Sequence, residues 1–242
     1  MNKIFGRKPV LEAINAGVDL EVIYVAYGQH GDVIHKIFNS AKERGIKITQ
    51  ISQQKFNELA RSENAQGVIA VKSVATFYEL SEIIEHAKKS TYPLLLLLDS
   101  IQDPHNLGAI LRTAECSGVD GILITTNQSS PITETVEKIS AGAVSHLKIC
   151  KVNNLVRAIE QLKKENFWIV GSSLSNSKNY TSIDYKMPVA LVVGNEEKGI
   201  RKLVAENCDF LVKIPMPGKI DSLNVSVATG VLLFEILRQQ KS

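Results

Sequence analysis

The sequence lacks the features that mark several large classes of protein. Its three cysteines, Cys116, Cys150 and Cys208, are odd in number and far apart, and they form no C-x-x-C pair. Neither a disulfide framework nor a zinc cluster is therefore supported. No apolar signal segment follows the start of the chain, and the leucine run at 94–98 is too short to span a bilayer. We expect a soluble, cytoplasmic protein without a metal ion and without a membrane contact.

The glycine-rich motifs of the common nucleotide sites are also absent. The chain has no G-x-G-x-x-G dinucleotide fingerprint and no G-x-x-x-x-G-K-[ST] phosphate loop. The excess of positive charge is small, at +3, but it is unevenly distributed. Residues 1–75 hold ten Lys/Arg and seven Asp/Glu of the chain's 28 and 25, so the remainder is balanced. The excess favours a polyanion partner for the first segment, although an ordinary solvated surface has the same appearance.

The pattern of apolar residues divides the 242-residue chain into two α/β parts. Residues 1–75 alternate between helical and strand-like patterns, which predicts a small α/β domain. Residues 76–92 are polar and amphipathic, and we expect them to form a linker. From residue 93 to 242, short continuous apolar runs alternate with helical segments, which predicts a parallel sheet with helices on both faces. The expected strands of this domain lie at 94–98, 121–124, 167–170, 189–193 and 210–214.

Three polar stretches follow expected strands, where open parallel sheets bind ligands. The first, 99–121, places Asn106 where a helix N-cap would lie and carries Arg112 further along the helix. The second, 194–201, has Gly194 directly after a strand, which indicates either a ligand loop or a plain turn. The third, 215–230, alternates polar Ser222, Asn224 and Ser226 with apolar residues; an N-cap explains one of these polar residues but not all three.

Together these stretches resemble the motifs of the SpoU (TrmH-type) family of SPOUT methyltransferases. They stand here as NLGAILRTA (106–114), GNEEKG (194–199) and IPMPGKIDSLNVSVA (214–228), in the family's order. The resemblance covers residues 93–242 and is closest to enzymes that methylate a guanosine 2′-hydroxyl in 23S ribosomal RNA. It implies S-adenosylmethionine as cofactor, a homodimer and a C-terminal trefoil knot, a feature that is essentially absent from proteins in general.

The resemblance also assigns roles to individual residues. Cofactor contacts fall on Gly194, Ile214 and Leu223, with Ser172 and Met216 at the border of the pocket. Catalytic and substrate positions fall on Asn106, Arg112, Glu196, Ser222 and Asn224.

Residues 1–75 resemble the L30e-like domain that such enzymes use to bind RNA. The similarity rests on GRKPVLEAI (6–14) and NAQGVIA (64–70), which place Arg7 and Gln66 at the RNA. The family usually has histidine before the Gln-Gly pair, whereas this chain has Ala65, so any role of that histidine is absent.

The chemistry of such a transfer leaves one question open. A ribose 2′-hydroxyl is a poor nucleophile until its proton leaves, so the protein has to align the reactants and help to remove one proton. The family's usual candidate base is the arginine, here Arg112, but a guanidinium stays protonated in proteins. We expect Arg112 to clamp the phosphate of the target nucleotide and to stabilise the developing alkoxide, with Glu196 or a water as proton acceptor.

Two other functions share many of these features. The chain could methylate transfer RNA with the same chemistry, or it could be a non-catalytic RNA-binding or ribosome-assembly protein that keeps the fold. The intact motif residues argue against lost activity, and the separate first domain favours ribosomal RNA by analogy.

Overall fold

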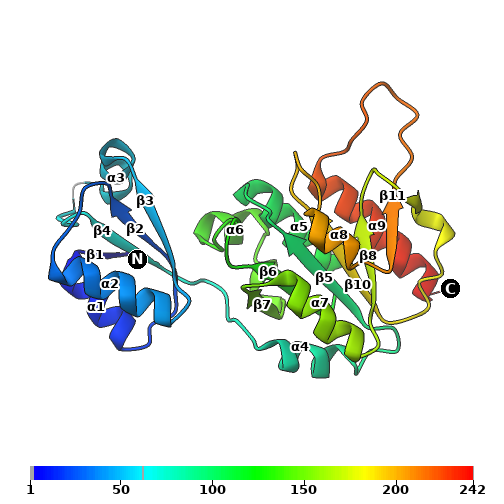
Figure 1. The fold of residues 1–242 in the computed structure, drawn as a ribbon, viewed down its shortest axis with the longest axis horizontal. Helices are drawn as coiled ribbons and strands as arrows, with labels where there is room; N and C mark the ends of the chain where they lie inside the picture. The colour runs from blue at the N-terminus through cyan, green and yellow to red at the C-terminus, as the bar shows by residue number, and fades with distance from the viewer. Residues whose placement is uncertain (1–2, 62, 242) are drawn as a thin grey trace. The chain divides into compact units, whose positions relative to one another are not determined.

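The computed structural model describes residues 3–61 and 63–241. The chain divides into two compact units (Figure 1). The first extends to Val74 and includes the short piece Pro131–Glu134, and the second comprises Ala75–Ser130 and the residues from Thr135 onward. No helix among the described residues is both long enough and apolar enough to cross a membrane.

The first unit is a four-stranded sheet between two layers of helices. The strands lie in the order β1-β4-β2-β3, and only β2 and β3 pair in parallel. One core forms between the sheet and helices α1 and α2, and a smaller one forms under α3. The elements are β1 (Lys3–Phe5), α1 (Arg7–Asn15), β2 (Leu20–Ala26), α2 (Asp32–Glu43), β3 (Lys47–Ile51), α3 (Gln53–Ala60) and β4 (Val68–Lys72).

The second unit contains a seven-stranded sheet in the order β7-β6-β5-β10-β8-β11-β9, and all of its neighbouring strands are parallel. Its strands are β5 (Leu94–Asp99), β6 (Gly121–Thr125), β7 (Ile149–Val152), β8 (Trp168–Ser172), β9 (Lys178–Asn179), β10 (Val189–Gly194) and β11 (Phe210–Lys213). Its helices are α4 (Leu80–Ala87), α5 (Pro104–Cys116), α6 (Glu134–Ile139), α7 (Leu155–Lys164), α8 (Lys202–Glu206) and α9 (Val225–Lys241).

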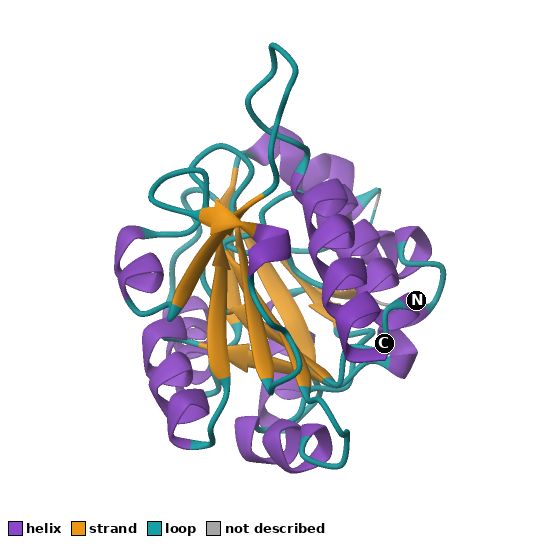
Figure 2. Ribbon diagram, turned by 90° about the vertical axis from the view of Figure 1, so that its right-hand side faces the viewer, coloured by secondary structure: helices purple, strands orange, loops and turns teal. Residues whose placement is uncertain are grey.

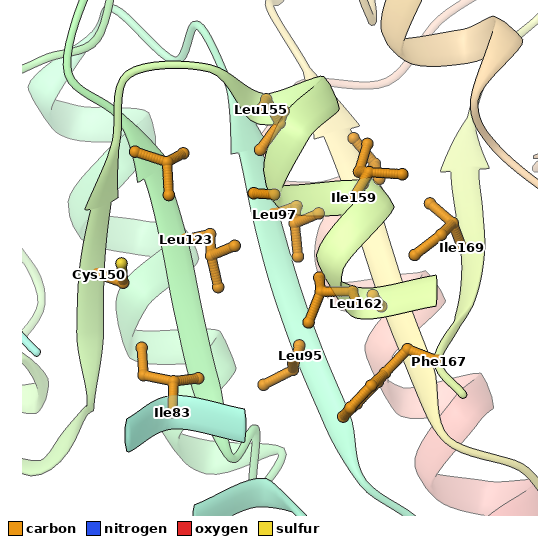
Figure 3. Packing of buried hydrophobic residues seen from close by; sticks show 14 of the residues in the cluster. Ile83, Leu95, Leu97, Leu123, Cys150, Leu155, Ile159, Leu162, Phe167 and Ile169 are labelled. Carbon is orange, nitrogen blue, oxygen red and sulfur yellow. The ribbon is translucent and has the colours of Figure 1, made fainter. Parts of the chain in front are cut away.

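Helices cover both faces of this sheet (Figure 2). On one face, α4 and α7 pack on alternate side chains of the strands, such as Leu95, Leu97 and Ile169 (Figure 3). Helices α5 and α9 pack against each other and cover the opposite face. Because both faces are covered, the central strands β5, β6 and β10 are buried along their whole length. The expected α/β fold with a parallel sheet is confirmed, while the C-terminal knot stays a prediction.

The segment 76–92, which we expected to be a linker, belongs to the second unit. Its middle forms helix α4, and Ile83, Ile84 and Ala87 are buried in the core against α7 and the sheet. Before this helix, Phe77 pairs with Ile149 at the β7 edge of the sheet. The amphipathic pattern therefore marks a helix that packs on the domain, because its apolar stripe needs a surface to cover it.

Candidate active site

A cavity of about 410 Å³ lies at the carboxyl ends of β8, β10 and β11. This volume is within the roughly 300–1,000 Å³ of small-molecule sites. The loops that follow these three strands line it, which is the usual location of a ligand in an open parallel sheet. All five residues that the resemblance implies for the cofactor line this cavity: Ser172, Gly194, Ile214, Met216 and Leu223.

The loop after β10 contributes the seven consecutive lining residues 194–200 and is closed by its own hydrogen bonds. The amide of Asn195 donates to the Gly199 carbonyl at 3.0 Å, and the Gly199 amide donates to the Asn195 carbonyl at 2.9 Å. The side-chain oxygen of Asn195 accepts from the amides of Glu197 and Lys198 at 3.0 and 3.2 Å. These hydrogen bonds within the loop define its shape.

The two glycines of this loop are each required for a different physical reason. A Cβ atom on Gly194 would lie 2.2 Å from the carbonyl carbon of Gly199 and from the nitrogen of Ile200. Close approach of two backbone segments thus requires glycine at 194. Gly199 has a φ of +65°, which L-residues with a side chain rarely adopt.

A chain of hydrogen bonds joins the three motifs. The Nδ2 atom of Asn106 donates to Oε1 of Glu196 at 2.8 Å, and Nδ2 of Asn224 donates to Oδ1 of Asn106 at 2.9 Å. The other carboxylate oxygen of Glu196 accepts from Nδ2 of Asn195 at 3.2 Å, and Oδ1 of Asn224 accepts from the Ser226 hydroxyl at 2.6 Å. Residues 118 positions apart in the chain therefore form one polar network beside the cavity.

The sequence suggests Asn106 as the N-cap of one helix and offers an N-cap as one reading of Ser222, and the structure places neither residue at a cap. The N-cap of α5 is Asp103, whose side chain accepts from the His105 amide at 2.9 Å, and Pro104 is the first helical residue. Asn106 is therefore inside the first turn, which frees its amide to bridge the other two motifs. At α9 the helix begins at Val225, and Asn224 accepts from the amide of Ser226, so Ser222 is not its cap.

The remaining two catalytic candidates differ in their placement. Ser222 lines the cavity and is exposed. Arg112 does not line it, although it lies on the same helix as Asn106, about 9 Å further along the helix axis. Arg112 is exposed, and no hydrogen bond or ion pair joins it to another described residue. The structure thus brings four of the five candidates together and leaves Arg112 apart from its own chain's cavity.

Sequence reasoning found Glu196 but missed the other charged side chains of the cavity. Glu197 and Lys198 in the β10 loop, Lys213 at the end of β11 and Asp221 in the last loop all line it. Each is adjacent to, or within, a motif, but their type alone does not distinguish them from solvated surface residues.

In the first unit, the two residues expected at the RNA are neighbours. The Nε atom of Arg7 donates to the backbone carbonyl of Gln66 at 3.0 Å, and Nη1 donates to the carbonyl of His30 at 3.3 Å. Nη2 donates to the Gln29 side chain. Several of the five N–H donors of Arg7 therefore form hydrogen bonds within its own chain, and these bonds hold three segments together. Gln66 is exposed, with a φ of +47°.

The lining of the cavity fits S-adenosylmethionine, which combines an aromatic base and a ribose with a charged amino acid. Apolar side chains supply a surface for the base: Val193, Ile200, Ile214, Met216 and Leu223. Serine hydroxyls and backbone groups supply hydrogen-bond partners, and the five charged residues of the lining, three acidic and two basic, match the zwitterionic end. Within the described part of the chain, no group of three or more His, Cys, Asp or Glu side chains is arranged to hold a metal ion.

Comparison with known proteins agrees with this geometry. A model described as the SpoU rRNA methylase family matches residues 93–234. The chain belongs to the SpoU methylase family. A second model, for the substrate-binding domain of RNA 2′-O ribose methyltransferases, matches residues 3–75. Membership in the SpoU family confirms the expected activity class, an RNA methyltransferase that depends on S-adenosylmethionine.

Individual relatives extend over nearly the whole chain. YacO of Bacillus subtilis, named as a TrmH family tRNA/rRNA methyltransferase, is 37% identical over 238 residues, which cover 98% of this chain and 95% of the relative. An rRNA methyltransferase of Sinorhizobium meliloti has a similar structure, with a TM-score of 0.63, 28% identity and coverage of 99% of this chain and 88% of its own. A TrmH/SpoU tRNA modifying enzyme of A. aeolicus has a TM-score of 0.59 and 35% identity, and covers 67% of this chain and 82% of its own.

Proposed function

We propose that this SpoU family protein transfers the methyl group of S-adenosylmethionine to the 2′-hydroxyl of a guanosine ribose in 23S ribosomal RNA. The observation that carries the proposal is the network of Asn106, Glu196 and Asn224 beside a cavity that fits the cofactor. The match of residues 3–75 to a domain of RNA 2′-O ribose methyltransferases supports the choice of the ribose hydroxyl.

The bound cofactor supplies an electrophilic methyl group, so the chain's own residues have to orient the hydroxyl and accept its proton. Glu196 is held through both oxygens by amide donors from Asn106 and Asn195. An ionised carboxylate has about four acceptor positions, so these two bonds leave Glu196 able to take a proton. We propose Glu196 as the acceptor and Asn106 as the residue that orients it. A water as acceptor is the alternative.

We propose Arg112 as the clamp on the phosphate of the target nucleotide. Its free guanidinium can present two parallel N–H donors to a phosphate. Because Arg112 lies outside the cavity of its own chain, it has to be brought to the reacting atoms either by the bound RNA or by a second copy in the proposed homodimer. Mixing Arg112→Ala protein with Gly194→Ala protein separates the two: recovered activity in the mixture indicates that one chain's arginine serves the other chain's cavity.

The share of this chain that aligns with each relative supports ribosomal rather than transfer RNA as the substrate. The rRNA methyltransferase of Sinorhizobium meliloti aligns with 99% of this chain, whereas the tRNA modifying enzyme of A. aeolicus aligns with 67%. A docking domain for a larger RNA explains the additional residues. We accordingly propose residues 1–75 as the RNA-docking domain, with Arg7 and Gln66 on its RNA-binding surface.

The test is methyl transfer with purified components. The protein is incubated with methyl-labelled S-adenosylmethionine and, separately, with unmodified 23S RNA and with unmodified transfer RNA, and the product nucleosides are separated. We expect label in 2′-O-methylguanosine from 23S RNA. Label in transfer RNA alone would support the second substrate, and cofactor binding without transfer to naked RNA or ribosomal particles would support a non-catalytic role. An Asn106→Ala control should bind cofactor and transfer far more slowly.

A further inference from the structure

A buried carboxylate lies behind the β10 loop without touching the cavity. Asp99 is the last residue of β5, its side chain is 0% exposed, and its backbone is paired with Gly194 across the sheet. Its Oδ2 atom accepts from the backbone amide of Arg201 at 2.9 Å, and its Oδ1 atom accepts from Nε of Arg201 at 2.7 Å. One carboxylate thus holds both the main chain and the side chain of the residue that ends the loop.

The other end of the loop is held by the next residue of the same strand end. The Nδ2 atom of Asn195 donates to the carbonyl of Ser100 at 3.2 Å. Ser100 is buried and has a φ of +66°, an unfavourable conformation for a residue with a side chain. Asp99 and Ser100 therefore fix the loop at both of its ends.

The position of this loop determines much of the site. Residues 194–200 supply seven of the residues that line the cavity, and Glu196 in their middle is the proposed proton acceptor. Neither Asp99 nor Arg201 lines the cavity, so any effect on the ligand has to pass through the loop. A buried carboxylate that loses its charged partner carries a large desolvation penalty, so the loop is more stable with Arg201 in place than without it.

We infer that Asp99 and Arg201 are positioning residues that hold the loop 194–200 in the form that binds the cofactor. This inference rests on the proposed placement of S-adenosylmethionine in the cavity. Because the Arg201 side chain is half exposed, solvent screening weakens its ion pair with Asp99. Loss of the guanidinium leaves the bond from the Arg201 amide intact, so the loop should loosen without loss of the fold.

The test compares Arg201→Ala with Lys202→Ala. Both variants remove one positive charge at neighbouring positions, but the Lys202 side chain is 91% exposed, and among the described residues its ammonium pairs only with Glu206, at 3.9 Å. Binding of S-adenosylhomocysteine is measured by calorimetry, and amide hydrogen exchange of the peptide that contains residues 194–201 is measured in cofactor-free protein. We expect Arg201→Ala to raise the Kd roughly tenfold and to speed exchange in this peptide, since charged hydrogen bonds are among the stronger ones. Lys202→Ala should match the wild type in both measurements.

The outcomes separate this inference from the proposed function. A wild-type protein that binds neither S-adenosylmethionine nor its product would refute the placement of the cofactor. Normal wild-type binding with unchanged Kd and unchanged exchange in Arg201→Ala would overturn the positioning role. If Arg201→Ala unfolds at the assay temperature, Arg201→Gln, which keeps a neutral donor, is measured in its place. An unchanged Kd and unchanged hydrogen exchange in Arg201→Gln would then overturn the positioning role. Arg201→Lys should restore binding only in part, because an ammonium cannot reproduce the planar N–H geometry.

Discussion

Replacement of Gly194 by alanine tests how closely the β10 loop has to fold on itself. The added Cβ atom would lie 2.2 Å from two backbone atoms and 2.3 Å from the Gly199 carbonyl oxygen, whereas real Cβ contacts are essentially never under 3.0 Å. The backbone at Gly199 therefore has to retreat by about 0.8 Å or more. The two hydrogen bonds between Asn195 and Gly199, at 3.0 and 2.9 Å, then stretch or break.

The cost follows from these two bonds. At about 0.5–1.5 kcal/mol each, their loss corresponds to roughly 1–3 kcal/mol. If the cofactor requires the closed loop, its Kd should rise roughly 5- to 150-fold. Gly218→Ala is the matched control in the neighbouring loop, because a Cβ atom there meets nothing within 4 Å and the residue lies outside the left-handed region.

Calorimetric titration of both variants with S-adenosylhomocysteine, together with thermal melting, provides the measurement. We expect Gly218→Ala to bind within twofold of the wild type, and Gly194→Ala to bind much more weakly with a lower Tm. Wild-type affinity in folded Gly194→Ala would show that the close approach of the two backbone segments has no part in cofactor binding.

Three further predictions concern the rest of the molecule. Arg112→Ala should lower the rate of methyl transfer by roughly 10²–10³-fold, and its cofactor Kd should be unchanged because Arg112 does not line the cavity. Arg112→Lys should lower the rate almost as much, and near-normal turnover of the lysine variant would contradict a bidentate clamp. Deletion of residues 1–74 should preserve cofactor binding, weaken RNA binding and make the RNA affinity less dependent on salt concentration. An equal salt dependence of RNA affinity in the full-length and truncated proteins would indicate that the second unit binds the RNA. Burial raises the pKa of the Cys150 thiol to about 11 and that of the Cys208 thiol to about 12. Iodoacetamide at pH 8 should therefore modify only the exposed Cys116 in the folded protein. Rapid modification of all three cysteines, measured by mass spectrometry, would contradict this prediction.

The central strands were predictable from the sequence because each is buried on both faces and is therefore a continuous apolar run. The five runs expected in the second domain correspond to β5, β6, β8, β10 and β11. Strands β7 and β9 were missed, since they lie at the edges of the sheet and are short or interrupted by lysine. Helix α4 was taken for a linker because its apolar stripe is narrow and its surroundings are polar.

The convergence of the three motifs was also predictable, since each follows a parallel strand and such strand ends meet at one edge of the sheet. The hydrogen bonds from Asn106 to Glu196 and from Asn224 to Asn106 confirm that they meet. The pairing of Asp99 with Arg201 was not predictable. These residues are 102 positions apart, and they meet only because β10 lies beside β5 in the sheet. No local pattern of residues carries that information.

The most direct test of the central claim is a map of ribose methylation in cells with and without this gene. Ribosomal and transfer RNA from both strains are analysed for 2′-O-methylated nucleotides at single-nucleotide resolution, and the missing mark is restored with the wild-type gene but not with Arg112→Ala. The proposed function predicts the loss of one 2′-O-methylguanosine in 23S ribosomal RNA and no change in transfer RNA. Identical maps from the two strains, or the loss of a base methylation in place of a ribose methylation, would contradict it.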